Sequence, residues 1–289
     1  MRMPNLIGLA LVAGVGLGAC AHLNEHGQSA DDESEDQLAA ELREHHRHHH
    51  RGGVTQFMAM SLDTLGEDDA QRPQLEKLHG SLRTCLSPVR EIETELVLIY
   101  ADGLGQPAMP TAKIDTAIAQ LNEASRAVSG CSIDAMNQLH ALLTPVEREV
   151  VADKVQAHWE IWREVNLEAD AGGKTQGSRL ADLSEELNLS TDQVAQMSAA
   201  LTVSYGRLAQ YEVKPAQSHV LAFAAAFVFD TFDASKVMAT AGEPFAAQGA
   251  RRMAIFYETV TPLLNPAQRT ELAEILREHA HHPVTLTSN

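Results

Sequence analysis

The chain has 289 residues, a formal net charge of −17 and only 4% aromatic residues. A chain this acidic repels nucleic acid and anionic lipid as a whole, and no nucleic-acid-binding signature occurs in it. Its length suits one large or two small domains, and plentiful alanine and leucine favour thin layers of packed helices.

Residues 1–19 are predicted to form an export signal that is removed. Arg2 gives a short positive region, residues 6–17 are apolar, and Leu-Gly-Ala-Cys ends at Cys20. The apolar stretch is too short to cross a bilayer, which takes about 20 residues. The ending resembles the bacterial lipoprotein lipobox, which implies cleavage before Cys20 and a diacylglycerol group on its sulfur. An ordinary secretory signal is the alternative. Ala21 in place of aspartate favours anchoring in the outer membrane, facing the periplasm.

Residues 20–55 are predicted to be an acidic, histidine-rich tether without a core of its own. The tract that could bind metal consists of His45, His46, His48, His49 and His50. If this tract is helical, the i, i+3 and i+4 spacing places several imidazoles on one face, where they suit Zn²⁺, Ni²⁺ or Cu²⁺. A solvated low-complexity tail is the open alternative, and no cofactor is required. A second group, near the C-terminus, is His279, His281 and His282.

A short phrase that recurs along the chain predicts the beginnings of helices. Its copies are Thr144 with Glu147, Ser190 with Gln193, and Asn265 with Gln268. This spacing is the capping box, in which each side chain accepts a hydrogen bond from the other residue's N–H. A weaker copy runs from Asp68 to Gln71, 122 residues before the copy at 190, and the copies at 144 and 265 are 121 apart. The near-equal spacing predicts a duplicated unit.

From residue 56 onward the apolar residues follow the helical period, so we expect an all-α fold. Two tandem repeats are predicted over 56–170 and 179–282, joined by a glycine-rich linker. Expected helices in the first repeat are 56–65, 69–100 with a kink at Pro88, 111–140 and 144–169. Those in the second are 179–188, 191–211, 216–231, 234–262 and 266–281, with a break at Lys214–Pro215.

Two cysteines remain once Cys20 is lipidated. Cys85 and Cys131 both fall in the first repeat, and an even number of cysteines in an oxidising compartment indicates a disulfide. Two buried free thiols are the alternative, because a bridge requires the two Cα atoms to lie within about 7 Å.

Residues 220–229 form the most apolar run after the signal. The phenylalanines in and beside this run are Phe223, Phe227, Phe229 and Phe232. An exposed patch facing a client or a second copy is one interpretation. A buried helix between the repeats is the favoured one, because helices that are apolar all round are usually buried. No nucleophile constellation occurs, so no catalytic residue and no enzyme activity are expected.

Four segments together resemble the Spy/CpxP family of periplasmic stress proteins, also called the LTxxQ-motif family. They are residues 143–148, 187–193, 230–237 and 264–269. The resemblance covers about 56–170 and 180–282. It implies two tandem helical-hairpin repeats in an elongated antiparallel assembly, either an intramolecular pseudo-dimer or a homodimer.

The same resemblance implies an ATP-independent chaperone, held at the membrane by its lipid, that binds unfolded periplasmic or outer-membrane proteins. Related ZraP-like and CnrX-like proteins imply the alternative of a heavy-metal buffer or sensor. The chain departs from the family pattern in being doubled, lipid-anchored and acidic, where Spy-type proteins are basic.

Overall fold

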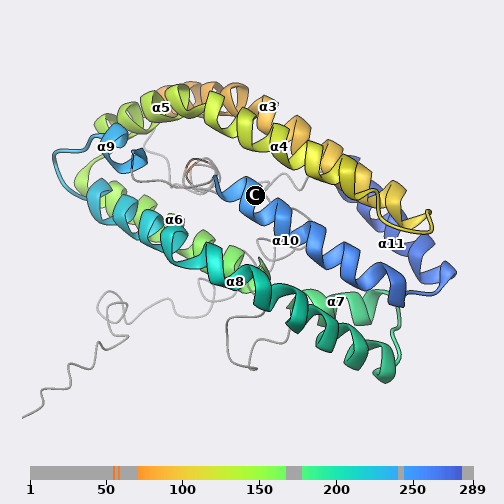
Figure 1. Ribbon diagram of the computed structural model, residues 1–289. Helices are drawn as coiled ribbons and strands as arrows, with labels where there is room; N and C mark the ends of the chain where they lie inside the picture. The colour runs from red at the N-terminus through yellow and green to blue at the C-terminus, as the bar shows by residue number, and fades with distance from the viewer. Residues whose placement is uncertain (1–54, 56–57, 59–70, 167–177, 240–243, 282–289) are drawn as a thin grey trace, which may run out of the picture. The chain divides into compact units, whose positions relative to one another are not determined.

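The computed structural model describes residues 55, 58, 71–166, 178–239 and 244–281, which all lie in one compact unit, residues 39–289. Every regular element in these residues is a helix (Figure 1), so the predicted all-α fold is confirmed. Cys20, the histidine tract at 45–50 and Asp68 fall outside the described residues. The predicted signal and tether therefore remain predictions.

The described helices fall into two halves on either side of residues 167–177. The first half contains α3 (Arg72–Leu104), α4 (Thr111–Ala127), α5 (Ser129–Leu142) and α6 (Pro145–Asn166). The second contains α7 (Ser178–Glu186), α8 (Thr191–Phe227), α9 (Ala234–Met238), α10 (Phe245–Val260), the 3-10 turn η1 (Thr261–Leu263) and α11 (Pro266–His281).

The division of the chain into helices differs from the predicted one at three places. The break expected at Lys214–Pro215 is wrong, because α8 runs unbroken through this point. A proline inside a helix costs about 3 kcal/mol, so the packing of α8 against α6 and α10 outweighs that cost. The helix expected over 111–140 is divided at Val128, just before Ser129 and Gly130, which are weak helix formers.

The helix expected over 234–262 is likewise two helices, α9 and α10. Pro244 is the N-cap of α10 and has an extended backbone (φ −55°, ψ 136°). A proline disfavours helical geometry in the residue before it, and so separates the two helices.

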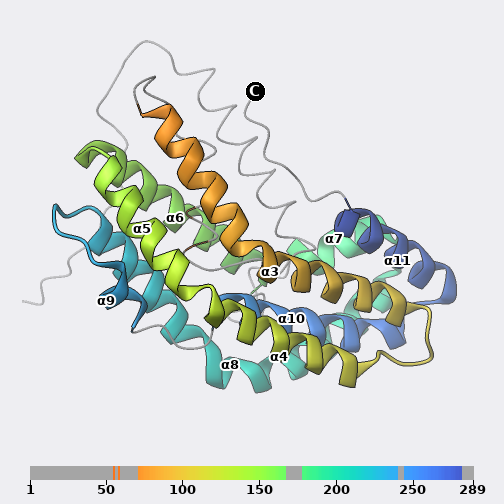
Figure 2. The same cartoon turned by 90° about the horizontal axis from the view of Figure 1, so that it is seen from above.

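The long helix α3 contains Pro88 at its midpoint and is nevertheless continuous. Figure 2 shows α3 changing direction partway along its length. A proline removes one backbone hydrogen bond and opens the helix on that side, which accounts for the bend.

Side chains from both halves of the chain build two hydrophobic cores. The first core joins the C-terminal part of α3 and the N-terminal part of α8 with α4, α7, α10 and α11. The second core joins the N-terminal part of α3 and the C-terminal part of α8 with α5, α6 and α9. Each long helix therefore passes through both cores.

The last helix of each half packs on the long helix of the other half. α11 lies along α3, and α6 lies along α8, while α10 contacts both α4 and α8 (Figure 1). Neither half has a core of its own, so the division into tandem repeats is not visible as two separate bodies. The duplication remains a prediction.

A disulfide joins Cys85 of α3 to Cys131 of α5, which decides between the two alternatives for these cysteines. Their Cα atoms are 6.3 Å apart, and the bond joins positions 46 residues apart in sequence. The disulfide ties the N-terminal part of α3 to α5, which packs on it.

The turn between α3 and α4 depends on a glycine. A Cβ atom on Gly103 would lie 2.6 Å from Cδ of Pro110 and 2.9 Å from Sδ of Met109. These distances are shorter than real Cβ contacts, so only glycine lets the chain reverse this closely.

Candidate functional site

All three strong copies of the recurring phrase form reciprocal capping boxes. In each box the cap residue's N–H donates to the side-chain oxygen three residues on, and that residue's N–H donates back to the cap. The first bond is 2.7 Å for Thr144 to Glu147, 3.1 Å for Ser190 to Gln193 and 3.0 Å for Asn265 to Gln268. The return bonds are 3.4, 3.2 and 3.0 Å. The boxes fix where α6, α8 and α11 begin.

A glutamine at the start of each half's long helix makes the same long-range bond. Gln193 Nε2 donates to the carbonyl oxygen of Leu263 at 3.0 Å, and Gln71 Nε2 donates to that of Leu142 at 3.1 Å. Each of these leucines lies two residues before a capping box. Gln71 makes this bond although no side chain caps α3 there. The bond recurs at the spacing of the sequence repeat.

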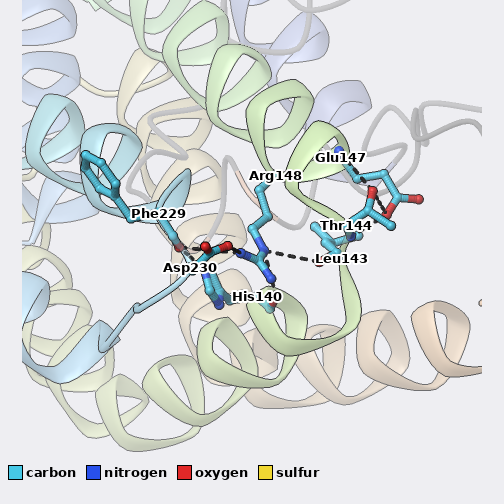
Figure 3. Close-up of polar contacts among 7 residues, drawn as sticks. All are labelled: His140, Leu143, Thr144, Glu147, Arg148, Phe229 and Asp230. Atoms are coloured by element: carbon cyan, nitrogen blue, oxygen red, sulfur yellow. Dashed lines mark hydrogen bonds and ion pairs between the residues drawn. The ribbon is translucent and has the colours of Figure 1, made fainter.

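Arg148 holds the corner between α8 and α9 against the first half of the chain (Figure 3). Its Nε donates to the carbonyl oxygens of His140 and Leu143, each at 3.1 Å. Its Nη1 lies 3.5 Å from the carbonyl oxygen of Phe229 and 3.4 Å from Oδ1 of Asp230. The Arg148 side chain is 13% exposed and that of Asp230 is 93% exposed, so the ion pair itself contributes little. The contacts with backbone carbonyls do the positioning.

His140 holds the same corner from α5. Its Nε2 lies 2.8 Å from the carbonyl oxygen of Phe229, and because a carbonyl only accepts, Nε2 carries the hydrogen. The ring stacks on Phe232 at 5.0 Å and meets the edge of Phe227 at 5.3 Å. Asn137 Oδ1 accepts from the Ala234 N–H at 2.9 Å. The first half of the chain therefore fixes the corner through side chains on α5 and α6.

A hydrogen bond within the corner also stabilises it. Asp233 is the N-cap of α9 and accepts from the Ser235 N–H at 3.0 Å. The hydrogen bond from the Ser235 side chain lowers the pKa of the Asp233 carboxyl. Sequence reasoning did not find the parts played by His140 and Asn137, which carry no local motif. An arginine directly after a capping box, at 148 and again at 269, was the available signal for Arg148.

The apolar run at 220–229 has two different faces. Val220, Phe223 and Phe227 are buried in the second core, and Ala224 is also buried. Leu221, Ala222, Ala225 and Phe229 are exposed. Among the four phenylalanines, Phe223 and Phe227 are buried and Phe232 is half-buried, so the four do not form one exposed patch. The buried-helix interpretation holds for the inner face, because the helical period turns those residues toward the core.

Two further histidines lie inside the packed helices. His158 on α6 is buried, and burial together with the charge of Lys154 lowers its pKa to about 4. Burial also lowers the pKa of His219 on α8. Both imidazoles are therefore neutral at neutral pH.

Two findings on metal binding and membrane spanning concern the described residues alone. Among them, no group of three His, Cys, Asp or Glu side chains could hold a metal ion. His279 Nδ1 lies 2.9 Å from the carbonyl oxygen of Ile275 in its own helix, while His282 and the tract at 45–50 fall outside the described residues. A search of the described helices finds none with the length and apolar character needed to span a membrane.

No protein-family model, no curated protein and no solved structure matches the chain. The site therefore has to be interpreted from its own residues. In the part of the chain that the structure describes, the polar side chains of this site fix helix ends and the α8–α9 corner. Beside that corner, the outer face of α8 carries exposed apolar side chains.

Proposed function

We propose that the protein is a lipid-anchored periplasmic chaperone that holds unfolded envelope proteins on a helical surface without nucleotide. The observation that carries this proposal is the exposure of large apolar side chains on well-packed helices. Val146 is 69% exposed, Val203 59% and Phe229 64%, with Val150 and Leu221 also open. Exposed apolar side chains that lie close together are typical of surfaces that bind other proteins, and Leu221 and Phe229 both lie near the C-terminal end of α8.

Three further observations support the proposal. The motifs that resemble those of the Spy/CpxP family begin helices, as the resemblance implies, and the glutamine bonds recur at the repeat spacing. The disulfide between Cys85 and Cys131 suits an oxidising compartment such as the periplasm. The two shared cores support a pseudo-dimer within one chain in preference to a homodimer.

The physical basis of holding is weak apolar contact guided by charge. Each exposed apolar side chain offers a small area, so a client binds at several points and is released without a nucleotide-driven step. With a net charge of −17, the surface attracts basic segments and repels acidic ones. Clients are therefore unfolded proteins with a positive charge.

Aggregation of a basic and an acidic unfolded protein, followed by light scattering with and without this protein, tests the proposal. We expect suppression for the basic protein at near-equal molar ratios, and less at high salt because exposed charges are screened. Absence of suppression for both proteins at low and at high salt would contradict the chaperone function.

A periplasmic heavy-metal buffer or sensor is the second candidate, and the five histidines within residues 45–50 are the observation that favours it. Titration calorimetry with Zn²⁺, Ni²⁺ and Cu²⁺ on the full chain and on a chain without residues 45–50 tests it. Loss of binding on deletion supports metal binding by the tract. Equally weak binding by both chains contradicts the metal-binding function.

A further inference from the structure

The C-terminal end of α8 is apolar on its outer face as well as on its inner face. Every residue from Val220 to Phe229 is apolar. At about 100° per residue, Leu221, Ala222 and Ala225 fall within an arc of about 100° on α8, and Phe229 lies two residues beyond the end of the helix. They form one stripe, here called the α8 stripe: Leu221, Ala222, Ala225 and Phe229. Leu221 is 45% exposed and Phe229 64% exposed, so the two large side chains stand in water at opposite ends of the stripe.

The other long helix shows that the fold does not require apolar residues here. Asp102 lies two residues before the end of α3, where α8 has Ala225, and both are exposed. Asp102 pairs with Arg277 of α11 at 2.9 Å. Gln106 lies two residues after the end of α3, where Phe229 follows α8, and both are again exposed. The corresponding places on α3 therefore carry a charged and a polar side chain.

Charge identifies what the α8 stripe accepts. Asp230 follows Phe229 directly, and its carboxylate is almost fully exposed, whereas the guanidinium of Arg148, 3.4 Å from it, is mostly buried and bound to carbonyl oxygens. The stripe thus ends in an accessible negative charge. A second copy of this chain would bring a like charge to the same place, and an anionic lipid surface would also be repelled. A partner with a cationic side chain next to apolar ones fits both the α8 stripe and the Asp230 carboxylate.

Length identifies the form of the occupant. Leu221 lies six residues before the end of α8 at Phe227, which is about 9 Å along the helix, and Phe229 lies two residues past that end. An extended chain of about four residues covers the helical part and reaches past its end. A run of four apolar residues followed by a lysine or arginine matches the stripe in length and in charge.

We propose that the α8 stripe and Asp230 form a docking surface for an extended segment of an unfolded protein, made of about four apolar residues followed by a basic one. This proposal rests on the proposed chaperone function and adds to it where a client binds and which segment is chosen. Because the stripe lies on a helix whose inner face is packed in the second core, it is ordered before the client arrives.

Binding of a fluorescein-labelled, disordered 12-residue peptide containing Leu-Val-Leu-Phe-Arg-Arg tests the proposal by fluorescence anisotropy. The test variant carries Leu221→Gln and Phe229→Gln, and the control variant carries Ala195→Gln and Ala199→Gln at exposed positions of the same helix. Burying a Leu or Phe side chain is worth about 1.5–3 kcal/mol, so we expect the test variant to raise the Kd at least about tenfold. The control variant is expected to leave it within about twofold.

A separate variant tests whether Asp230 binds the basic residue of the peptide. Asp230→Asn is expected to weaken binding of the arginine peptide by about threefold at low salt and not to change binding of the same peptide with glutamine in place of arginine. All replaced side chains are exposed, and circular dichroism melting of each variant checks that the fold is retained.

The outcomes separate this proposal from the chaperone function. If the wild type suppresses aggregation and the test variant binds the peptide as well as the wild type does, the α8 stripe is not the docking surface and the function stands. If the wild type neither binds the peptide nor suppresses aggregation, the function fails as well. If sedimentation shows a wild-type dimer that the test variant converts to a monomer, a second copy covers the stripe and the proposal is overturned.

Discussion

Gly103 is expected to be the one glycine of α3 that cannot be replaced by alanine. Alanine in a helix interior normally stabilises by about 1 kcal/mol relative to glycine. At Gly103 the added Cβ atom would lie 2.6 Å from Cδ of Pro110 and 2.9 Å from Sδ of Met109. The methionine side chain can rotate away, but the proline ring cannot without moving the turn. Overpacking of this kind costs about 1–3 kcal/mol and offsets that gain, so we expect a net loss of up to about 2 kcal/mol for Gly103→Ala.

The matched control is Gly80→Ala in the same helix. Gly80 is exposed, and a Cβ atom there would meet nothing within 4 Å. This variant should gain about 0.5–1 kcal/mol. Urea unfolding followed by circular dichroism, with the disulfide intact, measures both changes. The two variants should shift the midpoint in opposite directions. An equal gain in stability for both would refute the argument that the α3–α4 turn needs a glycine at 103.

Three further changes test the packing and the site. Replacing both Cys85 and Cys131 by serine removes a cross-link between positions 46 residues apart. The loop entropy of the unfolded chain then lowers the free energy of unfolding by about 4 kcal/mol, which urea unfolding measures. If reduction of the wild type leaves its stability unchanged, this prediction is contradicted. For His158, burial and a nearby positive charge lower the pKa to about 4 in the folded protein, against 6.5 ordinarily. The unfolded chain therefore binds the proton more readily, and stability is full above pH 6.5. It falls by about 3 kcal/mol as the pH drops to 4, and His158→Leu should flatten this part of the pH profile. Finally, Arg148→Lys keeps the charge but removes the Nε–H that binds two carbonyls, so we expect a loss of about 1–3 kcal/mol. Arg277→Lys, at an exposed ion pair, should change the free energy of unfolding by no more than about 1 kcal/mol. Equal losses for the two variants would argue against a positioning role for Arg148.

The sequence predicts those parts of the fold that short-range chemistry determines. Capping boxes at Thr144, Ser190 and Asn265 involve residues three apart, so the beginnings of α6, α8 and α11 follow from the sequence alone. The all-α class follows from the period of the apolar residues for the same reason. Cysteine parity indicated the disulfide, although only the approach of α3 to α5 makes it feasible.

Features that depend on distant packing could not be predicted. Pro215 indicated a break, but α8 runs on through it, and helices from elsewhere in the chain pack on α8 before and after this point. The run at 220–229 gave no sign of which side faces water, because both sides are apolar. The bonds from Arg148 and His140 to the corner near Phe229 join residues more than 80 positions apart, and no local pattern marks such a pair.

Since both long helices pass through both cores, loosening either end of this bundle removes support from the other. Heating should therefore melt the two halves of the chain in one step, and a calorimeter should record a single peak. The same interlocking limits evolution: a large side chain gained in one half must fit beside residues supplied by the other. The halves are thus obliged to change together, even where their motifs have drifted apart.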